Sequence, residues 1–69
     1  MFVCNIKPLG KGVRVKRIPN ISEFKIQDEY LILYVEDEEH GLLTHRLKMC
    51  YYQWIEIYYM DKLVVRLDG

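Results

Sequence analysis

The chain has 69 residues, of which 51% are apolar, and a formal net charge of zero. It has neither the net positive charge of a typical nucleic-acid-binding domain nor the net negative charge of a nucleic-acid mimic. No uncharged apolar run approaches the roughly 20 residues that span a membrane, so we expect no membrane association. The length predicts one domain, residues 1–69, near the lower size limit for a stable core.

Residue types along the chain favour strands over helices. Alanine is absent, and Val, Ile, Tyr, Phe, Trp and Thr supply 23 of the 69 positions; such side chains pack well on a pleated sheet. Period-two alternation predicts a first hairpin of strands 2–6 and 13–18 around a Gly-rich turn. It predicts a second hairpin of strands 23–27 and 30–36, joined by a tight turn at residues 28–29.

The second half of the chain begins with an acidic loop at 37–40, after which residues 42–49 read as a returning strand. From 47 to 58 the apolar spacing fits a helix as well as a strand. Residue types favour a strand from Trp54 onward, with a short helical turn near 48–53.

Two apolar strands at the C-terminus predict a last hairpin with a three-residue connection, 60–62. This register sets Glu56 opposite Arg66, a favourable cross-strand pair. It also aligns Ile55 with Leu67, Ile57 with Val65 and Tyr59 with Leu63. The predicted fold is therefore all-β: a meander of six to seven strands that forms a small barrel or a strongly bent sheet.

Charge is separated along the chain although the total is zero. Residues 1–25 contain six Lys and Arg against one Glu, whereas residues 26–45 contain six Asp and Glu and no Lys or Arg. Cys4 and Cys50 are too few for a disulfide-stapled secreted domain, and no signal peptide precedes them. We therefore expect a cytoplasmic protein with two reduced, buried thiols.

The sequence predicts no catalytic site, metal or cofactor. His45 and Cys50 lie five residues apart, but a nucleophile also needs an orienting group and an oxyanion site within a cleft, for which so short a chain has little room. The acidic run at 36–40 lacks the alternating ligand spacing of a calcium loop. No Cys or His pair has the short spacing of a zinc site.

Two charged segments are candidate contact sites. The basic residues Lys7, Lys11, Arg14, Lys16 and Arg17 could contact phosphates or an acidic partner. The acidic residues Glu36, Asp37, Glu38 and Glu39 could contact a basic partner. The alternative is that the first segment is an edge strand protected from aggregation by its charges, and that the second is a solvated hairpin tip. The first segment lacks the Lys-Ser/Thr of a phosphate-binding loop.

Aromatic residues form the third candidate site. In the predicted register the face opposite the core carries Tyr30, Tyr34, Tyr52, Trp54 and Tyr58. Tyr and Trp are enriched in the cores of protein interfaces. This face is either a contact surface or a second core layer that the N-terminal hairpin covers.

These features predict a small non-enzymatic protein-binding module, and no stretch resembles the motif of a known family. We favour an accessory or inhibitor protein that docks on a larger macromolecule, as short orphan chains of phages and mobile elements do. One alternative is a small β-barrel that binds nucleic acid through the basic N-terminal hairpin, for which we expect negligible DNA binding at physiological salt. Another is a structural subunit that self-assembles, for instance as a homodimer.

Overall fold

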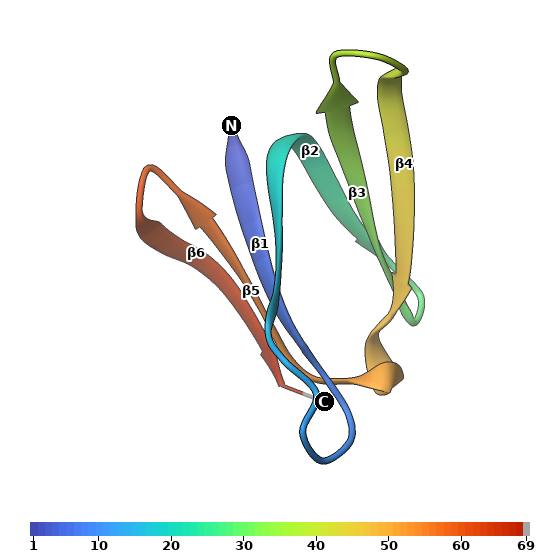
Figure 1. Ribbon diagram of the computed structural model, residues 1–69, viewed down its shortest axis with the longest axis vertical. Coiled ribbons are helices and arrows are strands. Elements are labelled where there is room, and N and C mark those ends of the chain that lie inside the picture. Colours follow the sequence, from blue (N-terminus) through green and yellow to red (C-terminus); the bar gives the residue numbers. More distant parts are fainter. Residues whose placement is uncertain (69) are drawn as a thin grey trace.

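The computed structural model describes residues 1–68 and forms one antiparallel sheet of six strands. The elements are β1 (Phe2–Pro8), β2 (Lys16–Gln27), β3 (Tyr30–Asp37), β4 (Gly41–Lys48), the 3₁₀ helix η1 (Met49–Tyr51), β5 (Tyr52–Tyr59) and β6 (Lys62–Asp68). The strand order is β4-β3-β2-β1-β5-β6. The chain therefore meanders from β1 to β4, and η1 carries it back so that β5 pairs with the free side of β1 (Figure 1).

Strand β2 is long and bent, and it belongs to both halves of the sheet. Its first part pairs with β1 and its second part with β3, and Ile21 has a partner in each, Phe2 and Val35. Asn20 has a positive φ of 62°, and both pairings shift register beside Ile21. Such irregularities bend a strand and increase its twist. The prediction of two separate strands, 13–18 and 23–27, is therefore wrong.

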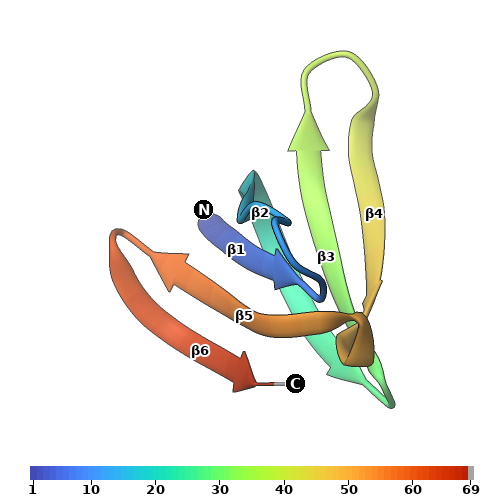
Figure 2. The same cartoon turned by 60° about the horizontal axis from the view of Figure 1, so that its bottom comes forward.

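The bend turns β2–β4 toward β1, β5 and β6 without closing a barrel (Figure 2). Strands β4 and β6 remain edges, so the fold is the strongly bent sheet among the predicted alternatives. The core between the two halves consists of Cys4, Ile6, Ile21, Leu31, Leu33, Ile55 and Ile57. Phe2 extends this core, because its ring lies 5.2 Å from that of Phe24 and 5.1 Å from that of Tyr59, measured between centroids.

The helical turn predicted near 48–53 is confirmed as η1, which spans three residues. The Met49 amide donates to the Glu29 carbonyl at 2.9 Å, and the Leu9 amide donates to the Tyr51 carbonyl at 3.1 Å. These bonds attach η1 to the β2–β3 turn and to the end of β1. No helix within residues 1–68 has the length and apolarity needed to cross a membrane.

The C-terminal hairpin follows the predicted register over most of its length. Glu56 lies opposite Arg66, Ile55 opposite Leu67 and Ile57 opposite Val65. The predicted three-residue connection and the Tyr59–Leu63 pair are wrong. Met60 and Asp61 form a two-residue turn with φ values of 49° and 64°, a conformation whose twist matches a hairpin. Because the turn is one residue shorter than predicted, Val64 is an extra residue that forms a bulge, and Leu63 lies opposite Tyr58.

Candidate functional site on two outer faces of the sheet

The structure divides the predicted aromatic face into two separate surfaces. Tyr30 and Tyr34 lie on the outer side of β3, whereas Trp54 and Tyr58 lie on the outer side of β5, and two strands separate β3 from β5. Because the sheet folds over one core, these outer sides point away from each other. We call them the β3 face (Lys25, Tyr30, Ile32, Tyr34, Arg46, Lys48) and the β5 face (Val3, Asn5, Arg17, Trp54, Glu56, Tyr58, Arg66).

Tyr52 belongs to neither face. Lys7 pairs with Trp54 and Pro8 pairs with Tyr52, so Gln53 is an extra residue in β5. A bulge of this kind interrupts the alternation of side chains. Tyr52 consequently packs against the core, and its predicted place on a contact surface is wrong.

On the β3 face, basic side chains lie over aromatic rings. The Arg46 guanidinium carbon is 4.6 Å from the centroid of the Tyr30 ring, and the Lys25 Nζ is 6.0 Å from that of Tyr34. Ile32, between the two tyrosines on β3, is only 7% exposed. Lys25 and Arg46 flank it as its cross-strand partners on β2 and β4. The result is a row of rings held in place by cations.

On the β5 face, the basic side chain that lies over Trp54 is that of Arg66, and two carboxylates lie beside it. Arg66 stacks 5.5 Å from the Trp54 centroid, forms an ion pair with Glu56 and approaches Asp68 at 3.2 Å. The Tyr58 hydroxyl donates to Glu56 Oε1 at 3.0 Å. This hydrogen bond to Glu56 raises the pKa of Tyr58 above its usual value, with desolvation as the next cause. The network holds Trp54 and Tyr58 in fixed positions and neutralises Arg66. The other cation of this face, Arg17, forms no ion pair within residues 1–68.

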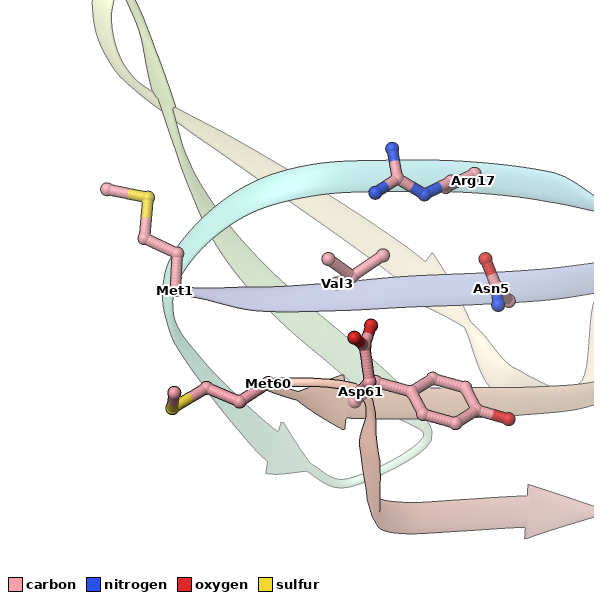
Figure 3. A pocket seen from close by; sticks show the side chains of 7 residues that line it. Met1, Val3, Asn5, Arg17, Met60 and Asp61 are labelled. Atoms are coloured by element: carbon pink, nitrogen blue, oxygen red, sulfur yellow. The ribbon is translucent and has the colours of Figure 1, made fainter.

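A shallow depression of about 390 Å³ lies beside Tyr58 on this face, within the size range of ligand pockets. It is lined by Met1, Val3, Asn5, Arg17, Tyr58, Met60 and Asp61 (Figure 3). We call it the β5 groove. Figure 3 shows Arg17 and Val3 on the adjacent strands β2 and β1, with Met1 and Met60 at one end. Tyr58, on β5, lies opposite Val3.

Of the residues that line the β5 groove, sequence reasoning named only Tyr58 and Arg17. The sequence does contain a signal for Met60. A residue that favours turns is expected after Tyr59, and the chain has a methionine at that position instead. Met60 is 77% exposed and has a positive φ of 49°. Asn, Asp or Gly normally occupies such a position, because a longer side chain is strained there.

The basic segment does not form the predicted strand. Strand β2 begins at Lys16, and Val15, which lies within the predicted strand 13–18, precedes β2 and is 50% exposed. The Lys7 ammonium donates to the Val13 carbonyl and so braces the loop between β1 and β2. Arg17 lines the β5 groove, whereas Lys11, Arg14 and Lys16 are exposed around the loop. The five cations therefore do not form one strip.

The acidic residues lie at the tip between β3 and β4 (Figure 1). The Glu39 amide donates to Asp37 Oδ1 at 2.8 Å, and His40 Nδ1 lies 3.3 Å from Asp37 Oδ2. The bond from the Glu39 amide, followed by that from His40, lowers the pKa of Asp37. Both contacts stabilise the turn, and Glu36, Glu38 and Glu39 are exposed around it.

The two thiols differ in their surroundings. Both are free, as predicted, but only Cys4 is buried; Cys50 is exposed on η1. Desolvation by burial raises the pKa of Cys4 to about 12. The neutral thiol therefore predominates at physiological pH, and Cys4 serves as a small apolar core residue.

Within residues 1–68, no group of three or more His, Cys, Asp or Glu side chains is arranged to hold a metal ion. Comparison of the chain with protein-family models, curated proteins and solved structures found no match. The two outer faces are therefore the candidate functional surfaces of the chain.

Proposed function

We propose that this chain is a small protein-binding module, an accessory or inhibitor protein whose contact surface is the β5 face with its groove. The observation that carries the proposal is Met60. A large apolar side chain occupies a strained turn position, is almost fully exposed and borders a depression. Backbone strain of this kind persists at functional sites because the side chain is needed there.

The composition of the surface supports the same function. Trp, Tyr, Met and Arg are enriched in interface cores, where they bring a large contact area. The β5 face and its groove combine Trp54, Tyr58, Met60, Arg17 and Arg66. The flexible side chains of Met1 and Met60 suit adaptable apolar contact.

We propose a partner protein that inserts an apolar side chain between Met1 and Met60. Arg17 and Asn5 would receive a carboxylate or a backbone carbonyl from the same segment, since both present donors to the groove. The two free thiols support a place for the protein in a reducing compartment such as the cytoplasm.

The test separates the stability of the turn from binding. Asn tolerates positive φ, so Met60→Asn should raise the free energy of unfolding by up to about 1 kcal/mol. The same change should abolish capture of the partner, because truncation of a central interface side chain costs about 2 kcal/mol or more of binding free energy. Thermal melts measure the first effect; quantitative pull-downs from nuclease-treated lysate of the native host measure the second.

Leu42→Asn is the matched control, since Leu42 is 60% exposed but lies on β4. We expect it to capture the same protein as the parent chain. Equal capture by the parent, Met60→Asn and Leu42→Asn would show that the β5 groove is not the contact surface.

A further inference from the structure

We infer that the β3 face is a second binding surface, independent of the β5 groove, and that its ligand is a single-stranded nucleic acid. Three cations of this face lie beside three aromatic rings, two of which belong to the face (Tyr30 and Tyr34) while the third, Tyr51, lies next to it on η1. The residues come from β2, β3, β4 and η1. Their contacts are Arg46 over Tyr30 at 4.6 Å, Lys25 over Tyr34 at 6.0 Å and Lys48 over Tyr51 at 5.5 Å.

The geometry of the face suits stacking of bases. Tyr30 and Tyr34 point to the same side of β3 with Ile32 between them, and Tyr51 continues the aromatic surface at the η1 end, where its side chain is 62% exposed. Within residues 1–68, no other element covers the outer side of β3 and β4 (Figures 1 and 2). A cation lies over one face of each ring, so a base would stack on the other face of the ring or on the Arg46 guanidinium.

The β3 face has cations without carboxylate partners, although the chain as a whole is neutral. Within residues 1–68, neither Lys25 nor Arg46 forms an ion pair; Lys48 alone approaches a carboxylate, that of Glu29, at 3.5 Å. Glu23 lies opposite Tyr34, and Glu36 follows Tyr34 on the same side of β3, whereas Glu29 pairs with Lys48 at the Tyr30 end. The unpaired positive charge of this face is therefore that of Lys25 and Arg46, on either side of Ile32. Cations that lie beside rings, rather than in a separate cluster, can contact phosphates while the rings hold the bases.

This placement also explains why the basic loop is not the nucleic-acid site. In the described part of the chain, neither Lys11 nor Arg14 lies over an aromatic ring. Such cations can attract phosphates but cannot hold bases. A duplex is equally unsuited to the β3 face, because paired and stacked bases hide their faces from side chains.

Binding is measured by fluorescence anisotropy with a labelled oligo(dT) and oligo(U) of about 12 nucleotides, within the usual site size. A duplex of the same length and a polyglutamate peptide serve as competitors. At roughly 50 mM salt we expect single strands to bind and both competitors to fail to displace them. With three phosphate contacts, the slope of log K against log salt should be about −2.

Variants separate stacking from charge. Tyr30→Leu should weaken binding by about 5- to 100-fold with the slope unchanged, because it removes a stacking ring and no cation. Arg46→Gln should make the slope shallower by about 0.7. The loop variants Lys11→Gln and Arg14→Gln, which keep both faces intact, should bind like the parent. Thermal melts confirm that each variant is folded.

Three results would overturn the inference. The first is no binding to either single strand at low salt. The second is loss of binding in the loop variants instead of in Arg46→Gln. The third is displacement by polyglutamate as effective as that by unlabelled oligo(dT), which would identify the surface as one for acidic peptides. Because Met60 lies on the other face, none of these results bears on the proposed protein contact, which the Met60→Asn variant tests separately.

Discussion

The two outer faces of the sheet have similar residues and different physical properties. Each carries two aromatic side chains on one central strand and an arginine stacked on one of them. On the β5 face, Glu56 and Asp68 neutralise Arg66. On the β3 face, no carboxylate of residues 1–68 forms an ion pair with Arg46. Both arginines stack on an aromatic ring, and the neighbours on the sheet decide whether the arginine also has a carboxylate partner.

Truncation of core side chains should have the largest effect on stability, and it tests whether the two halves of the sheet share one core. Leu33 on β3 and Ile57 on β5 are both 0% exposed, so Leu33→Ala and Ile57→Ala should each cost about 2–5 kcal/mol. So small a domain could unfold altogether, and Ile57→Val, at about 0.5–1.5 kcal/mol, gives a measurable series.

Far-UV circular dichroism reports the whole sheet, whereas Trp54 fluorescence reports the β5 side alone. We expect the two melting curves to coincide in every variant. Ile26→Ala is the control, since Ile26 is 48% exposed and should change stability by less than about 0.5 kcal/mol. A Leu33→Ala variant that keeps a native fluorescence transition would show that the halves fold separately.

A smaller effect distinguishes outer-face aromatic residues from core residues. Trp54 and Tyr34 are half-buried, so Trp54→Ala and Tyr34→Ala should each cost about 1–2 kcal/mol, below the 3–5 kcal/mol of a fully buried aromatic residue. Both variants should remain folded in thermal melts. Unfolding of both at room temperature would mean that the faces are internal layers.

A finer comparison concerns one ion pair on each face, Glu56–Arg66 and Glu29–Lys48. The side chain of Glu56 is 15% exposed, whereas that of Glu29 is 64% exposed. Double-mutant cycles should therefore give a larger coupling free energy for Glu56–Arg66 than for Glu29–Lys48, because water screens the second pair more. At roughly 1 M salt the Debye length falls to about 3 Å and the coupling of Glu29–Lys48 should vanish. Equal couplings at both salt concentrations would contradict this difference.

The smallest perturbation is chemical labelling of the thiols. Cys50 is exposed and should react with iodoacetamide in the native protein, whereas Cys4 is buried as a neutral thiol and should react only after unfolding. Mass spectrometry should show one added group in the native state and two in denaturant. Two groups on the native protein would show that the β1 region opens readily.

Several structural elements could be predicted from the sequence because their determinants are local. Alternation and turn length set the β2–β3 hairpin, in which Phe24 lies opposite Leu33 and Ile26 opposite Leu31, as the pattern indicates. The Glu56–Arg66 pair follows from the same reasoning. The short helical turn before β5 follows from the helical spacing that precedes the run of β-forming residues. In each case neighbours along the chain contain the information.

The tertiary structure alone decided which side chains meet. A single extra residue at Gln53 turns Tyr52 toward the core, and alternation along the chain cannot reveal a bulge that depends on pairing with β1. Lys25 and Arg46 lie 21 positions apart in the sequence and flank the same Ile32 only because β2 and β4 pair with β3. The β5 groove likewise depends on the pairing of β1 with both β2 and β5, which brings Arg17, Asn5, Val3 and Tyr58 together. Local patterns determine strands and turns, whereas long-range strand pairing determines faces and sites.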